Sequence, residues 1–159
     1  MVPLCRALLA AGHDVAIASS RLFRAQLEAA GLDVVSAGVD WLESDIGAAF
    51  PEYPQHRARG ESKWYLQSEI FGWHTARAMA ADLIELAATR PVDVVIREPW
   101  ELGGALAAAH LGIPCVLHGI GPIANVEEEV ELHGLISTGR YQTIRSVWSR
   151  RKQPLSRTN

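Results

Sequence analysis

Four residues of the kind that bind or process a ligand follow two apolar segments of the chain. Glu98 and Trp100 come just after the apolar run 92–96, and His118 and Gly119 come directly after the run 113–117. Short apolar runs are typical of strands that are buried on both faces of a parallel sheet. Open parallel sheets bind their ligands at the carboxyl ends of the strands. The spacing therefore predicts a ligand site with a carboxylate, an imidazole and an indole ring available.

The elements that would position these residues alternate between helix and strand. Further apolar runs predict strands at 15–18 and 32–35, and helical periodicity predicts helices in the intervening segments, the longest at 61–89. This alternation is typical of an α/β fold with a doubly wound parallel sheet. The polar segment 38–60 is interrupted by two prolines and predicts a long loop.

The start of the chain departs from the usual order of this fold class. Pro3 fits the first turn of a helix, so the chain opens in a helix. Doubly wound domains normally begin with a central strand that feeds the first helix. We therefore expect the first strand of the sheet to be absent from this sequence.

Composition and charge exclude several classes of function. The formal net charge of -3 gives no electrostatic reason to expect a nucleic-acid partner. No apolar run reaches the roughly 20 residues that a membrane span requires, and no basic segment that would begin a signal peptide precedes Pro3. Cys5 and Cys115 are too far apart in sequence to indicate a disulfide framework or a metal cluster, and we expect both to be buried. These features favour a cytoplasmic protein without a bound metal.

Motifs of several large enzyme classes are absent from the sequence. It contains no glycine-rich dinucleotide or phosphate loop, no nucleophile elbow and no zinc-binding H-E-x-x-H helix. We therefore expect no cofactor.

An ordered series of segments resembles the N-terminal, acceptor-binding half of bacterial GT-B glycosyltransferases. These enzymes decorate macrolides, enediynes and other natural products and are similar to UDP-glycosyltransferases. Each segment alone is weak evidence, and the argument rests on their order over residues 3–122. The segments are PLCRALLAAGHDV at 3–15, AAGL at 29–32, PVDVVIREP at 91–99, GGA at 103–105 and LGIP at 111–114.

The resemblance implies transfer of a sugar, with inversion, from a nucleotide-sugar donor to a hydroxyl of a hydrophobic small molecule. In the family a histidine acts as the general base, and an acidic residue orients its ring. Glu98 matches the position of that acid. The family's base lies in a turn before the segment that matches residue 2, and the donor-binding domain follows the acceptor-binding half. The resemblance thus implies a fragment that is truncated at both ends.

Further residues become candidates for contact with the acceptor. Trp100, His118 and Gly119 lie at the predicted strand ends, and the long predicted helix carries three aromatic residues, Trp64, Phe71 and Trp73. Aromatic residues at helical spacing also occur in ordinary cores, so the sequence leaves both roles open. We expect residues 1–122 to form a partial Rossmann-like acceptor-binding domain and 123–159 to be its helical or disordered extension.

Two other readings remain open from the sequence. The chain could be a non-catalytic acceptor-binding or auxiliary module, or an unrelated doubly wound protein such as a flavodoxin-like domain.

If the chain is a glycosyltransferase fragment, we expect the purified 159-residue chain to show no sugar transfer. Loss of a general base alone lowers a rate by about 10²–10⁴-fold. The measurement is turnover with nucleotide sugars, and turnover that disappears on mutation of an internal residue would contradict the expectation.

Overall fold

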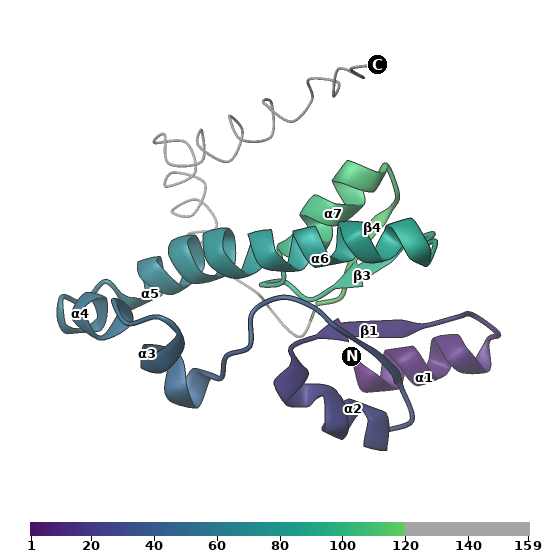
Figure 1. Ribbon diagram of the computed structural model, residues 1–159, viewed down its shortest axis with the longest axis horizontal. Helices are drawn as coiled ribbons and strands as arrows, with labels where there is room; N and C mark the ends of the chain where they lie inside the picture. Colours follow the sequence, from purple (N-terminus) through teal and green to yellow (C-terminus); the bar gives the residue numbers. More distant parts are fainter. Residues whose placement is uncertain (120–159) are drawn as a thin grey trace, which may run out of the picture. The chain divides into compact units, whose positions relative to one another are not determined.

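Two parallel strand pairs form the sheet structure of residues 1–119. The structure is a computed structural model and describes residues 1–119; the predicted extension 123–159 lies outside the described residues. The first pair joins β1 (Ala16–Ser19) to β2 (Asp33–Ser36), and the second joins β3 (Val95–Arg97) to β4 (Cys115–Leu117). Helices connect the strands within each pair (Figure 1). The predicted α/β class with parallel strands is therefore confirmed.

The helices between the strands follow from local sequence signals. α1 (Val2–Ala10) carries Pro3 in its first turn, where a proline needs no hydrogen-bond partner. The Ser20 side chain accepts a hydrogen bond from the Leu22 amide and so caps the 3-10 helix η1 (Arg21–Phe23), which continues into α2 (Arg24–Ala29). α7 (Gly103–Leu111) ends at Gly112, whose φ of 72° is left-handed.

The second strand pair differs from the prediction in its boundaries. The predicted strand 92–96 begins three residues later, at Val95, because its partner becomes available only there: the Val95 amide donates to the carbonyl of Pro114, and β4 starts at the next residue. The helix that the sequence predicts from Trp100 begins at Gly103. Cys5 is buried as expected, whereas Cys115 is exposed, since all three residues of β4 are exposed.

The prediction of a long loop at residues 38–60 is wrong. It contains the 3-10 helix η2 (Glu43–Asp45) and two short helices, α3 (Ile46–Ala49) and α4 (Tyr53–Ala58). Pro54 lies in the first turn of α4, where it starts a helix rather than breaking one. Phe50, between the two helices, is buried in a cluster with Tyr65 and Ile70.

The predicted long helix 61–89 is confirmed as three consecutive segments. They are α5 (Ser62–Trp64), the π-helical segment η3 (Tyr65–Thr75) and α6 (Ala76–Thr89) (Figure 1). Within the described residues, no helix is both long and apolar enough to cross a membrane.

α6 makes close contact with α7 and is tied to the first strand pair by polar bonds. At Gly103 an added Cβ would lie 2.6 Å from the Met79 Cβ and 2.7 Å from the Ala76 carbonyl oxygen. The Arg90 guanidinium at the end of α6 binds Asp14 at 2.9 Å and Asp33 at 2.5 Å. These bonds, to Asp33 and then Asp14, raise the pKa of Arg90.

We expect Gly103→Ala to lower the free energy of unfolding. The new methyl group would overlap a backbone carbonyl that cannot rotate away, and overpacking of this kind costs about 1–3 kcal/mol. This cost opposes a gain in helix propensity of up to about 1 kcal/mol. Gly47→Ala in α3 is the matched control, because its Cβ would meet Pro54 at an ordinary 3.5 Å. Urea titration of both variants measures the difference, and equal stability of the two would contradict the prediction.

Candidate functional site at the ends of β3 and β4

The carboxyl ends of β3 and β4 bring two predicted site residues to neighbouring positions. Arg97 and Leu117 are the last paired residues, and the His118 amide donates to the Arg97 carbonyl at 2.8 Å. Glu98 and His118 therefore follow the strands side by side, with Gly119 next in the chain. Both Glu98 and His118 are partly buried, and Gly119 is exposed.

Arg97 holds the turn that carries Glu98 and Trp100. Its Nη1 donates to the carbonyls of Glu98 and Pro99, each at 3.1 Å, and to the carbonyl of Glu101 at 3.4 Å. A single guanidinium nitrogen thus ties together the backbone of residues 98–101. The sequence analysis did not assign Arg97 a role, although a charged residue at the end of an apolar strand is a signal that could have found it.

Glu101 fixes the other end of this turn. Its carboxylate accepts hydrogen bonds from the amides of Gly103 at 2.9 Å and Gly104 at 2.6 Å. These are the first two amides of α7, which lack partners within the helix. An added Cβ on Gly104 would lie 2.7 Å from Glu101 Oε2, so the carboxylate lies closer to the helix backbone here than a side chain at residue 104 would allow without a shift. Burial raises the pKa of Glu101, and the two amide bonds and Arg97 offset part of that rise.

Two buried nitrogen atoms near the strand ends lack hydrogen-bond partners among the described residues. They are Nε of Arg97 and Nδ1 of His118. Buried polar atoms are almost always paired in folded proteins, so each unpaired one calls for an explanation.

One of the three aromatic residues predicted on the long helix meets the strand ends. Phe71 stacks on Trp100 with ring centroids 6.0 Å apart. Phe71 also contacts Trp41, with ring centroids 5.9 Å apart. Trp64 instead packs against the cluster of Phe50, Tyr65 and Ile70. Trp73 lies under the Arg77 guanidinium at 4.5 Å, a cation–π contact.

The aromatic surface at this edge is therefore formed by Trp100 and Phe71, and Trp41 connects Phe71 to the cluster of Phe50, Tyr65 and Ile70. Trp41 was not predicted as a site residue, because it lies in the segment 38–60 that the sequence predicted to be a long loop. The described residues contain no group of three or more His, Cys, Asp or Glu side chains that could hold a metal ion.

Comparison with known proteins gives one family and several related enzymes. A family model described as erythromycin biosynthesis protein CIII-like, N-terminal domain, matches residues 6–151. The chain is 33% identical over 137 residues to the L-demethylnoviosyl transferase of Streptomyces niveus. The aligned region covers 82% of this chain and 34% of that protein.

Two solved structures are similar in fold as well as in sequence. The glycosyltransferase VinC in complex with dTDP matches 76% of this chain and 31% of its own, with 31% identity and a TM-score of 0.58. The spinosyn rhamnosyltransferase SpnG complexed with spinosyn aglycone matches 79% of this chain and 32% of its own, with 26% identity and a TM-score of 0.56. The chain thus spans about a third of the length of these proteins.

The buried carboxyl of Glu101 predicts a characteristic dependence of stability on pH. Burial raises its pKa in the folded chain above the ordinary glutamate value of about 4.5. The folded state therefore binds more protons than the unfolded state between these two pKa values. The contribution of Glu101 to stability is full below the unfolded pKa and is lost as pH rises through the folded pKa.

Urea unfolding of the wild type and Glu101→Gln between about pH 4 and 7 tests whether the stability contributed by Glu101 falls as pH rises. The stability of the wild type relative to the variant should fall as pH rises. Glu61→Gln is the contrasting control, because hydrogen bonds from His56 and Arg59 lower the pKa of Glu61. The wild type should gain stability relative to that variant as pH rises. Slopes of the same sign in both comparisons would rule out the assignment for Glu101.

Proposed function

The chain belongs to the erythromycin biosynthesis protein CIII-like N-terminal domain family, and on this basis we propose that it forms the acceptor-binding side of a glycosyltransferase. The reaction is transfer of a sugar, with inversion, from a nucleoside diphosphate sugar to a hydroxyl of a hydrophobic small molecule. Similar proteins support both substrates: one was solved with dTDP and another with an aglycone. No metal or cofactor is part of this proposal.

One observation carries the proposal for this chain's own residues. Glu98 and Trp100 lie two residues apart in the turn that Arg97 and Glu101 hold. The turn therefore presents a carboxylate and an aromatic ring at the same edge, in a fixed relation to each other. Such a pairing suits a reaction in which an apolar molecule must be held while one of its hydroxyls loses a proton.

The role of Glu98 is to position the imidazole of the general base. This histidine is not His118: in the family it lies in a turn before the segment that matches residue 2. A carboxylate that accepts a hydrogen bond from the ring fixes its tautomer and stabilises the imidazolium that forms when the hydroxyl proton is taken up. The deprotonated oxygen then attacks the anomeric carbon while the nucleoside diphosphate leaves from the opposite face, and this in-line displacement inverts the configuration.

Trp100 and Phe71 provide an apolar surface for the acceptor. Both rings are partly buried, and their stacked contact holds them in place without full coverage. Trp41 contacts Phe71 and packs against the Phe50 cluster, so it supports this surface from the core. His118 follows β4 at the same strand ends and is the hydrogen-bonding side chain that we assign to a hydroxyl or carbonyl of the acceptor.

Kinetics of two variants separate these roles in a transferase that contains this chain. A chimaera in which residues 1–119 replace the matching part of the L-demethylnoviosyl transferase provides the same test. Glu98→Gln keeps the shape of the side chain but removes its charge, so it should lower kcat by about 100-fold or more with little change in KM. Trp100→Ala should raise KM for the acceptor about tenfold and change kcat less, because it removes a binding surface.

Glu43→Gln is the matched control, since Glu43 is an exposed carboxylate in η2. It should leave both constants unchanged. Full kcat in Glu98→Gln would show that Glu98 is an ordinary turn carboxylate, and the assignment of its role would fail.

A further inference from the structure

A polar pocket lies at the carboxyl ends of the other strand pair, β1 and β2. It measures about 260 Å³ and is lined by Arg21, Ser36, Ala37, Gly38, Asp40 and Asp82. Pockets for drug-sized ligands are typically about 300–1,000 Å³, so this one suits a smaller molecule, such as a single ring. The function proposed above assigns it no role.

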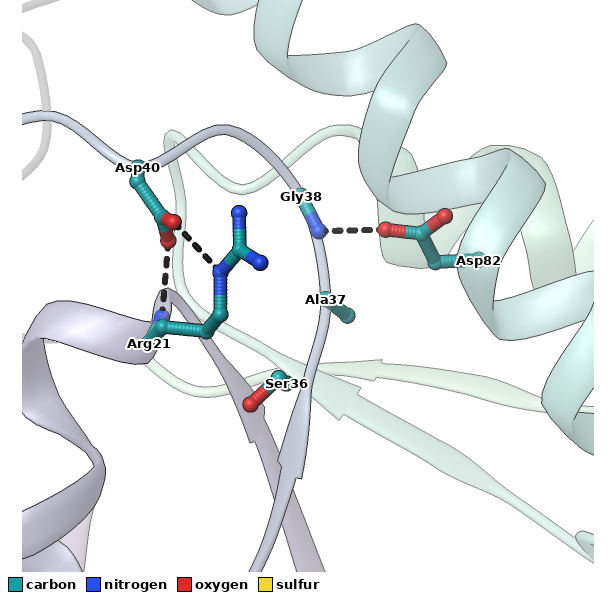
Figure 2. Close-up of a pocket in the computed structure, with 6 residues that line it drawn as sticks. All are labelled: Arg21, Ser36, Ala37, Gly38, Asp40 and Asp82. Carbon is teal, nitrogen blue, oxygen red and sulfur yellow. Dashed lines mark hydrogen bonds and ion pairs between the residues drawn. The ribbon is translucent and has the colours of Figure 1, made fainter.

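Asp40 holds Arg21 at the rim of this pocket. Asp40 accepts hydrogen bonds from the Arg21 amide at 2.8 Å and from its Nε at 2.6 Å (Figure 2). These bonds lower the pKa of Asp40, first through the Arg21 side chain, so the carboxylate stays ionised near neutral pH. Ser20 donates a further hydrogen bond to the same carboxylate at 3.0 Å.

The bonding pattern leaves donors and an acceptor available to a ligand. Among the described residues, the two terminal nitrogens of the Arg21 guanidinium make no hydrogen bond, and that side chain is 77% exposed. Asp82 uses one carboxylate oxygen to accept from the Gly38 amide at 2.8 Å, and its second oxygen is free of such a bond (Figure 2). The Ser36 oxygen accepts from Arg24, so its hydrogen remains available as a donor.

The charges around the pocket decide which ligand class fits. Two carboxylates, Asp40 and Asp82, oppose a bound anion. The Arg21 guanidinium is paired with Asp40 through Nε, and its terminal nitrogens can donate to a neutral acceptor. A hydroxyl group both accepts from a guanidinium and donates to a carboxylate. We propose that this pocket binds a neutral ring bearing neighbouring hydroxyl groups, of the size of a pyranose sugar. The inference goes beyond the proposed transfer reaction and does not depend on it.

The test is titration of the 159-residue chain with methyl α-D-glucopyranoside, followed in nitrogen–proton correlation NMR spectra. The Gly38 amide and the Arg21 Nε–H report on the pocket directly, because each bonds to one of its carboxylates. We expect saturable shifts of both signals. Inorganic phosphate should leave them unchanged at constant ionic strength.

Two variants assign any binding to this pocket. Arg21→Met removes the donors but keeps much of the side chain's length, and Asp82→Asn keeps an oxygen for Gly38 while replacing the free one by a donor. Each should weaken binding about tenfold, a typical effect of losing a hydrogen bond to a charged group. Arg57→Met, at an exposed arginine of α4 outside the pocket, should bind the sugar as the wild type does.

The result is decisive in either direction. Absence of saturable shifts, equal binding by Arg21→Met and Arg57→Met, or the same shifts with phosphate would each overturn the proposal. Sugar binding here needs no transfer activity, so failure of the kinetic test of Glu98 leaves the outcome of this titration unaffected.

Discussion

The close approach of α7 to α6 at Gly103 is the contact on which the candidate edge depends. Since Gly103 has no side chain, its backbone lies against Met79 and the Ala76 carbonyl. The start of α7 is thereby set, and the Glu101 carboxylate can reach the amides of Gly103 and Gly104. The turn before Glu101 is in turn fixed by Arg97. Packing between two helices thus determines where a carboxylate and an indole ring are presented.

Ion pairs and a hydrogen bond from α6 help to position the first strand pair, β1 and β2. β1 pairs only with β2, and β3 only with β4, among residues 1–119. Connection between the pairs therefore comes from α6, through Arg90 to Asp14 and Asp33 and through Asp82 to the Gly38 amide. Exposed ion pairs contribute little stability individually, about 0–1 kcal/mol. Their importance here is positional, because Asp82 also lines the polar pocket.

Much of this arrangement follows from the sequence, and the errors have physical causes. Apolar runs located the four strands of residues 1–119, because a short apolar run bounded by turn residues is a strong local signal. The predicted burial of both strand faces is wrong, since β1 is only partly buried and β4 is exposed. The start of β3 could not be found from its own residues, since it depends on where Pro114 ends and β4 begins. Pro54 was taken as a helix breaker, although a proline in the first turn starts a helix, as it does in α4.

The aromatic residues show a different limit of sequence analysis. Trp64 and Phe71 are seven residues apart, a spacing that places side chains on one face of an α-helix. The segment Tyr65–Thr75 is π-helical, with hydrogen bonds one residue longer than in an α-helix. This wider turn changes the angle between successive side chains, so Trp64 packs in the core cluster while Phe71 reaches Trp100. Helical periodicity could therefore locate the segment but not its faces. Because π-helical geometry is rare, rules based on the α-helical period do not predict which neighbours Phe71 meets.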